Sequence, residues 1–250
     1  MLSSEKQKLT NFISIAGDFL YSGYKNVQID YNLKENTTIS SKNDINLTSV
    51  STDTIEKITD EIKVCKNCVL AGTRTNAAAG EGVMQPIVMV IGEGPGRDED
   101  LQGRPFVGAA GQLLDKMLSS IGLSRDTNTF IANIVKCRPP SNRDPHPEEA
   151  SACAHFLERQ ILVLKPKFIL ASGRIAAQTL LKTGEPIGKL RGGFKEFKTG
   201  GFNFPLLVTY HPAALLRSED LKRPAWEDLK LLKSRIEAAN EGDPAKTGGN

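Results

Sequence analysis

Four short apolar runs alternate with longer amphipathic stretches from about residue 54 onward. The runs at 87–91, 130–135, 168–171 and 204–210 are almost continuously apolar, and Gly, Pro or polar residues bound each of them. Such runs predict strands that are buried on both faces. Apolar positions at three- and four-residue spacing predict the helices between and after them, at about 113–121, 147–165, 175–181 and 226–239.

This alternation of strands and helices predicts an α/β domain over residues 54–240. Parallel strands joined by helices form a sheet that is covered on both faces. We therefore expect a three-layer α/β/α fold with a central four-stranded parallel sheet. Ligands of such sheets bind at the carboxyl ends of the strands, so the loops that follow the strands are where functional residues are expected.

The two ends of the chain have a different pattern. Residues 9–20 carry apolar side chains at helical spacing, and residues 32–54 are rich in Asn, Ser and Thr. This pattern predicts a short amphipathic helix followed by a linker that buries little surface. We expect residues 1–53 to form a loosely attached extension, with docking of its helix on the main domain or on a protein partner as the alternative. The polar residues 241–250 predict a disordered tail.

The composition is that of a soluble globular protein. Of the 250 residues, 39% are hydrophobic and 24% charged, and the net charge is +3. These values exclude collagen, a coiled coil and disorder along the whole chain. No apolar run reaches the roughly 20 residues that a membrane helix needs, and no signal peptide is visible. We expect a cytoplasmic monomer, and the mild positive charge fits a polyanionic partner as well as many soluble enzymes.

The four cysteines carry a strong chemical signal. Cys65 and Cys68 form a C-x-x-C motif, Cys137 follows the second predicted strand, and Cys153 lies in the helix predicted at 147–165. Four thiolates are the usual ligands of a structural zinc ion or of a four-iron cluster, and the spacing alone does not separate these two. Disulfides are disfavoured because nothing in the sequence indicates secretion.

The loop after the first predicted strand has the sequence GEGPG at 92–96. It resembles the dinucleotide-binding fingerprint only weakly, because Pro95 interrupts the pattern and the acidic segment 98–100 follows in place of a helix. An acidic segment would also repel a pyrophosphate. We interpret the loop as a tight turn that carries Glu93 into a cleft, with a solvated surface carboxylate as the alternative.

Three further loops carry candidate ligand-binding side chains. Phe106, within GRPFVG at 103–108, is either a core residue or a platform for stacking. Asn133 lies on an apolar strand, so its amide must be paired with backbone groups or with a ligand such as a nucleobase edge. His211 begins the sequence HPAALLR at 211–217. Apolar side chains beside a cation are typical of loops that distort DNA, although a helix start with core leucines has the same pattern.

Together these motifs resemble the family 4 uracil-DNA glycosylases, the iron–sulfur branch of the uracil-DNA glycosylase superfamily. The matching motifs lie, in order, at 92–96, 99–100, 103–108, 110–114, 133–140 and 211–217, and the resemblance covers about 54–240. It implies hydrolysis of the N-glycosidic bond of deoxyuridine in DNA, which leaves an abasic site. It also implies a 4Fe-4S cluster on the four cysteines rather than zinc, and we expect Lys136 and Arg138 beside the cluster to contact phosphates.

The resemblance implies a role for each pocket residue. Glu93 is expected to position or polarise the attacking water, and His211 to donate a hydrogen bond to uracil O2. Phe106 is expected to stack on the flipped-out uracil. The amide of Asn133 is expected to read the edge of the base.

Further residues are implied around this pocket. Gly94 and Glu99 are expected to lie beside the base. Leu215, Leu216 and Arg217 are expected to press into the minor groove of uracil-containing DNA.

Two rival interpretations come from other functional classes. A related covalent uracil-DNA-binding branch carries an inserted basic loop with a nucleophilic His, but the matching region at 188–193 contains no His. A non-catalytic iron–sulfur DNA-binding module, tethered to a polymerase through residues 1–25, is the second rival. The joint presence of Glu93, Asn133 and His211 argues against it.

Overall fold

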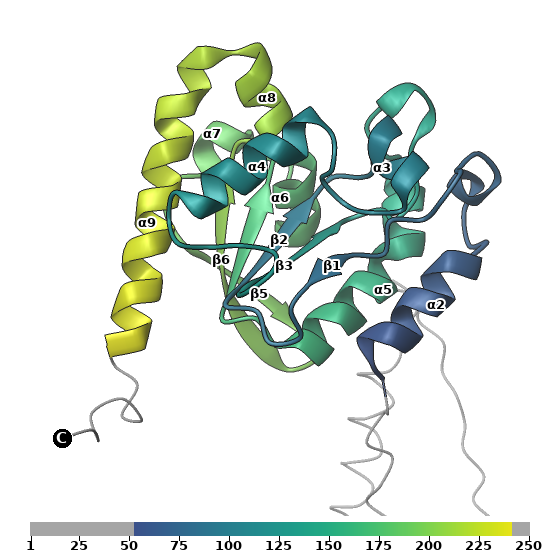
Figure 1. The fold of residues 1–250 in the computed structure, drawn as a ribbon, viewed down its shortest axis with the longest axis horizontal. Coiled ribbons are helices and arrows are strands. Elements are labelled where there is room, and N and C mark those ends of the chain that lie inside the picture. Colours follow the sequence, from purple (N-terminus) through teal and green to yellow (C-terminus); the bar gives the residue numbers. More distant parts are fainter. Residues whose placement is uncertain (1–52, 242–250) are drawn as a thin grey trace, which may run out of the picture. The chain divides into compact units, whose positions relative to one another are not determined.

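The structure of the protein is a computed structural model that describes residues 53–241 (Figure 1). The helix predicted at 9–20 and residues 242–250 of the predicted tail lie outside the described residues. No helix between residues 53 and 241 is long and apolar enough to cross a membrane.

The described residues form a mixed α/β fold around one six-stranded sheet. Its strands are β1 (Glu81–Gly82), β2 (Val88–Gly92), β3 (Thr129–Asn133), β4 (Phe168–Ser172), β5 (Lys195–Thr199) and β6 (Phe202–Thr209). The order across the sheet is β1-β3-β2-β4-β6-β5. The four strands that the sequence predicts are parallel to one another in the middle of the sheet. The four predicted strands form only the central, parallel part of a wider sheet, because β1 and β5 add antiparallel edges.

The two edge strands lack the pattern that identified the other four. β1 has only two residues. In β5 only Phe197 is buried, and Lys195, Glu196 and Lys198 are polar. Short strands and charged side chains are usual at sheet edges, where they discourage pairing with other chains. Neither edge strand therefore contains the apolar run by which the other four strands were predicted.

Helices cover both faces of the sheet. They are α2 (Ile55–Val64), α3 (Arg97–Gln102), α4 (Ala109–Ser119), α5 (Pro147–Leu164), α6 (Arg174–Leu181), α7 (Ile187–Leu190), α8 (Pro212–Arg217) and α9 (Lys222–Glu241). Successive residues of a strand point to opposite faces. Met89 and Ile91 of β2 accordingly pack with α2, α5 and α6, whereas Val88 and Val90 pack with α4 and α9.

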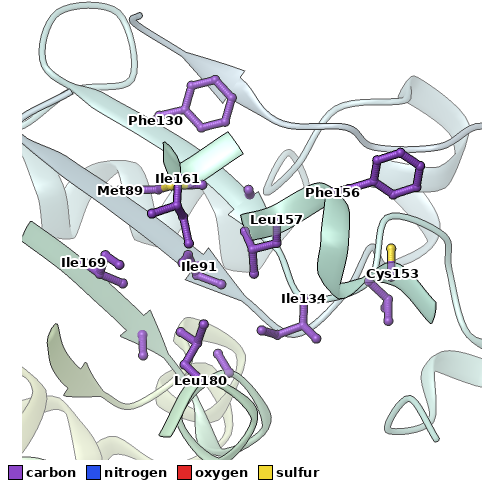
Figure 2. Close-up of a cluster of buried hydrophobic side chains, with 14 of the residues drawn as sticks. Met89, Ile91, Phe130, Ile134, Cys153, Phe156, Leu157, Ile161, Ile169 and Leu180 are labelled. Carbon is purple, nitrogen blue, oxygen red and sulfur yellow. The ribbon is translucent and has the colours of Figure 1, made fainter. Parts of the chain in front are cut away.

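Figure 2 shows part of the first of these two cores. Leu157 and Ile161 of α5 lie over Ile91 of β2, and Cys153 lies farther along the same helix. The end of α5 that carries Cys153 is the end where Pro147 occupies the first turn. Packing of α5 on the sheet therefore fixes the position of one of the four cysteines relative to the strands.

The acidic segment at 98–100 is helical, which corrects the sequence interpretation. It lies in α3, whose first turn contains Asp98, Glu99 and Asp100. Acidic side chains in the first turn stabilise a helix because they face the unpaired amides and the positive end of its dipole. Oε2 of Glu99 accepts a hydrogen bond from the amide of Gly96 at 3.1 Å. The negative charge of this segment disfavours a phosphate site, and the same charge stabilises the N-terminus of α3.

Candidate active site

A cleft of about 610 Å³ opens at the carboxyl ends of the four parallel strands. Gly92 at the end of β2 pairs with Asn133 at the end of β3, and Ser172 of β4 pairs with Thr209 of β6. The loops that begin at these four positions therefore start side by side. They bring into one cleft several side chains that are far apart in the sequence: Glu93, Phe106, Asn133 and His211.

His211 is held in one tautomer by the backbone that follows it. It is the N-cap of α8, and its Nδ1 accepts a hydrogen bond from the amide of Ala213 at 3.2 Å. Because a backbone amide can only donate, Nδ1 carries no proton and the neutral ring must carry its proton on Nε2. Burial, and to a smaller extent the Arg217 guanidinium, lower the pKa of His211 to about 4. His211 is therefore a neutral Nε2–H donor at pH 7.

The ring of Phe106 lies beside His211, with the two ring centroids 5.4 Å apart and the planes tilted by 31°. The Phe106 side chain is buried, with 5% of its surface exposed. A Cβ added at Gly92 would lie 2.5 Å from the Phe106 ring and 2.5 Å from Oδ1 of Asn133. Glycine at position 92 thus lets the aromatic ring and the amide approach the same strand end.

Asn133 is the most informative polar group of the cleft. Its side chain is 1% exposed, and its Oδ1 is buried without a hydrogen-bond partner among the described residues. A buried carbonyl oxygen that has no partner costs about 1–3 kcal/mol, so such an atom calls for an explanation. A ligand donor in the cleft would supply the missing bond.

Lys136 lies inside the protein, which contradicts its expected contact with phosphate. Its side chain is buried, and Nζ donates to the backbone oxygen of Asn133 at 2.9 Å and to Oε1 of Gln160 at 2.8 Å. Nε2 of Gln160 in turn donates to the backbone oxygen of Ala79 at 2.8 Å. Lys136 therefore fixes the strand end that carries Asn133.

Glu93 lies at the mouth of the same cleft and is partly buried. Burial raises the pKa of Glu93 to about 7, the Asp144 carboxylate adds to the rise, and the Arg174 guanidinium opposes it. Asp144 and Arg174 also line the cleft and form an ion pair with each other. Glu93 therefore changes its charge close to neutral pH.

Gly94 and Glu99 both line the cleft, as expected. The carboxylate of Glu99 is occupied by the protein backbone, since Oε1 accepts from the amides of Val107 and Gly108 at 2.8 and 2.9 Å. With its bond to Gly96, Glu99 joins the loop after β2 to the loop that carries Phe106. Glu99 shapes the pocket through these two loops.

The leucines after His211 differ in their surroundings. The side chain of Leu215 is buried, with 3% of its surface exposed, whereas that of Leu216 is 54% exposed. Arg217 is exposed and lines the cleft. A side chain that enters DNA must first be exposed, and Leu215 is buried in this structure. Its expected place in the wedge stays a prediction. Leu216 has the required exposure.

The four cysteines surround one small cavity at the edge of the first core. Cys65 and Cys68 follow α2, Cys137 follows β3 and Cys153 lies on α5, and all four line this cavity. Among residues 53–241, no three His, Cys, Asp or Glu side chains are placed to hold a single metal ion. Four thiols around one cavity are a donor set that fits either a structural zinc ion or an iron–sulfur cluster.

Arg74 also lines the cysteine cavity. Its Nη1 donates to Sγ of Cys137 at 2.9 Å, and its Nη2 donates to the backbone oxygen of Lys63 at 2.7 Å. Burial raises the pKa of Cys137, and Arg74 opposes the rise. Burial also raises the pKa of Cys153 to about 11. Buried thiolates need positive charge beside them, and Arg74 supplies part of it.

Comparison with known proteins gives the family of this chain. Residues 79–230 match the family model described as "Uracil DNA glycosylase superfamily". The chain belongs to this superfamily. It is 45% identical to the type-4 uracil-DNA glycosylase of Sulfurisphaera tokodaii, over 72% of this chain and 84% of that protein. It is 42% identical to those of Saccharolobus solfataricus (74% and 87% covered) and Thermotoga maritima (73% and 94% covered).

The raised pKa of Glu93 predicts how excision by this member of the superfamily depends on pH. The resemblance implies that ionised Glu93 orients water and stabilises positive charge, and on that basis we expect the single-turnover rate to rise about tenfold per pH unit below pH 7 and to level off above it. In Glu93→Gln the rate should be lower and the profile flat. An inflection near pH 7 that persists in Glu93→Gln would assign the titration to another group.

The same pKa shift predicts the opposite effect on stability. Between pH 4.5, the usual value, and about 7, the folded protein binds the Glu93 proton more tightly than the unfolded chain does. The free energy of unfolding is therefore higher while Glu93 is protonated, and it falls as the pH rises through this window. At pH 8, Glu93→Gln should be more stable than the wild type by roughly 1 kcal/mol, after allowance for solvent screening. Urea unfolding at pH 8 and at pH 4.5 measures the difference, which should vanish at the lower pH.

Two groups of cleft residues were not singled out from the sequence of this superfamily member. Arg174 begins α6 directly after β4, and Tyr210 precedes His211 after β6. Both follow a parallel strand, so the rule that located the other loops would have found them. Asp144 and Arg143 come from the stretch before α5, where no sequence pattern indicated an approach to the cleft.

Proposed function

We propose that this chain removes uracil from DNA by hydrolysing its N-glycosidic bond. The observation that carries the proposal is the meeting of three complementary groups in one cleft. These are the Nε2–H donor of His211, the unpartnered Oδ1 of Asn133 and the ring of Phe106. The relatives named above are uracil-DNA glycosylases, and they cover most of this chain.

Asn133 reads the base in this proposal. Uracil offers a donor at N3–H and an acceptor at O4, and an amide with Oδ1 and Nδ2 side by side matches both. Cytosine has the reverse pattern at these positions, so it would leave buried polar groups unpaired, a strong source of discrimination. The ring of Phe106 stacks on the flipped base and offsets part of the few kcal/mol that extrusion costs.

His211 and Glu93 act on the two sides of the bond that breaks. Negative charge develops on uracil as it leaves, and the Nε2–H of His211 donates to O2, where part of this charge gathers. Positive charge develops on the sugar, and ionised Glu93 stabilises it and orients the attacking water. Because the pKa of His211 is low, the imidazole ring is neutral at pH 7. The ring donates a hydrogen bond from Nε2–H to uracil and does not transfer the proton.

Leu216 and Arg217 form the DNA-facing end of the site. We assign to Leu216 the apolar wedge that takes the place of the extruded base, because it is exposed and follows the pocket residue His211 by five positions. Arg217 lies beside the cleft and binds a phosphate. Residues 54–240 contain every residue of this site, and we propose them as the glycosylase domain.

We propose a 4Fe-4S cluster on Cys65, Cys68, Cys137 and Cys153. The support is the shared cavity, the all-thiol donor set and the Arg74 hydrogen bond to Cys137. When bound, the cluster supplies cross-links between three segments rather than a redox step. The chain itself supplies base recognition and bond cleavage.

One experiment tests the proposed activity against both rivals. A single-turnover assay on one uracil-containing oligonucleotide is run beside a denaturing gel. Release of free uracil with no gel-stable adduct is the expected result. A crosslink without uracil release would indicate the covalent branch, and neither product would indicate a non-catalytic DNA-binding module.

A further inference from the structure

Phe106 has an unusual backbone conformation for a bulky residue. Its φ is 52°, in the left-handed region that residues with a side chain seldom adopt. Such a conformation costs roughly 1–3 kcal/mol and persists only where the surroundings hold it. The groups that hold Phe106 therefore also set where its ring lies in the cleft.

Arg125 donates to the two peptide carbonyls that flank the Cα of Phe106. Its Nη1 donates to the carbonyl oxygen of Pro105 at 3.2 Å, and its Nη2 donates to the carbonyl oxygen of Phe106 at 2.9 Å. The Arg125 side chain is only 10% exposed. Asp115 Oδ1 accepts from its Nε and Nη2 at 3.1 and 2.8 Å, and Glu81 lies 3.6 Å from its Nη1. Two carboxylates thus orient a guanidinium that donates to two successive carbonyls.

A carboxylate holds the amide groups that follow Phe106. The next two amides, of Val107 and Gly108, donate to Oε1 of Glu99. Position 111 is also constrained, because a Cβ there would lie 1.9 Å from the carbonyl oxygen of Phe106. The peptides before and after Phe106 are therefore fixed by a cation and an anion, and α4 leaves room for its carbonyl only because residue 111 is glycine.

We propose that Arg125 is a positioning residue for uracil excision, acting through the backbone of Phe106. Its hydrogen bonds to the carbonyls of residues 105 and 106 hold the Phe106 backbone in the left-handed conformation. This conformation places the Phe106 ring 5.4 Å from the His211 ring. The inference rests on the proposed stacking role of Phe106. Without Arg125, the backbone at 106 relaxes toward negative φ, the ring leaves the stacking position, and the flipped base loses its platform.

A double-mutant cycle tests whether Arg125 acts through Phe106. The variants are Arg125→Met, Phe106→Ala and the pair, each measured by single-turnover excision, by affinity for uracil-free DNA and by Tm. Loss of the stacking platform should slow excision about 10- to 100-fold in Phe106→Ala. Arg125→Met should approach that loss, and the double variant should be no more than about threefold slower than Phe106→Ala. Affinity for uracil-free DNA should hold in all three.

Two variants separate positioning from general ion pairing. Arg104→Met removes a bidentate pair with Glu81 but no contact with the 105–106 carbonyls, so it should keep the wild-type rate. Asp115→Asn removes one charge beside Arg125 and leaves both carbonyl bonds, so it should stay within about threefold of wild type. If Arg125→Met does not fold, Arg125→Lys is measured instead, because one ammonium cannot reproduce the paired donors.

The outcomes distinguish this inference from the proposed role of Phe106. Wild-type excision by Phe106→Ala would overturn the stacking role and the inference together. A slow Phe106→Ala beside a fast Arg125→Met would overturn the inference alone. Losses that multiply in the double variant would also overturn it, because Arg125 would then act independently of Phe106.

Discussion

Replacing His211 with alanine is expected to slow uracil excision by about 10²–10³-fold, the usual effect of removing one preorganised donor from an active site. The reason is the fixed tautomer, since the Ala213 amide on Nδ1 leaves Nε2–H as the donor. Affinity for uracil-free DNA should hardly change, because phosphate contacts dominate that binding. Single-turnover rates and a DNA-binding titration measure the two quantities separately.

Alanine at this position also removes the N-cap of α8, so a second variant is needed as a control. His211→Asn retains a capping acceptor but places no donor at the Nε2 position. It should be as slow as His211→Ala while keeping the wild-type Tm. His155→Ala, at an exposed position on α5, should keep the wild-type rate. Recovery of the wild-type rate in His211→Asn would show that capping, rather than donation to uracil, is the role of His211.

Cys153→Ala is expected to purify without iron and without the visible colour of an iron–sulfur centre. Its free energy of unfolding should fall by about 4 kcal/mol or more, as for other losses of a metal site. In a domain of this size that corresponds to a drop in Tm of roughly 8–16 °C. The loss is large because the cysteine cavity joins the segment after α2, the segment after β3 and α5. Iron analysis and thermal unfolding provide the measurement.

The matched control for this variant is the wild-type protein after its iron is removed with a chelator. If the cluster accounts for the effect, iron-free wild type and Cys153→Ala should unfold at nearly the same temperature. Wild type that purifies colourless with one zinc ion per chain would refute the iron–sulfur assignment while leaving the four-cysteine site in place.

The sequence predicted those parts of the fold that carry a long apolar signal. The four parallel strands and the helices α4, α5, α6 and α9 were found because buried strands and amphipathic helices have distinct periodicities. The edge strand β5 was not predicted, because only Phe197 is buried in it and it therefore has no apolar run. α3 was missed for a different reason, since its acidic first turn was treated as a charged loop rather than as a favourable helix start.

In the candidate site, motifs predicted which residues meet, but they did not predict which side chains are buried. Motif positions indicated that Glu93, Asn133 and His211 would meet, and the register of the strand ends places them around one cleft. The sequence did not reveal which of two adjacent leucines faces outward, because the helical phase of α8 depends on its contacts. It also gave no sign that Lys136 is buried, since a lysine beside a basic motif is usually a surface residue.

The short segment between Asn133 and Cys137 has no spare length. The amide of Ile134 donates to the Gly92 carbonyl at 2.9 Å, and the amide of Val135 donates to the Glu93 carbonyl at 3.1 Å. The Lys136 side chain returns to the carbonyl of Asn133. A one-residue insertion here would move Asn133 relative to Cys137, and these backbone hydrogen bonds and the Lys136 bond would not all be retained. The proposed base-reading amide and one proposed cluster ligand are therefore joined by a segment in which an insertion would disturb both sites, whereas a substitution can leave the spacing unchanged.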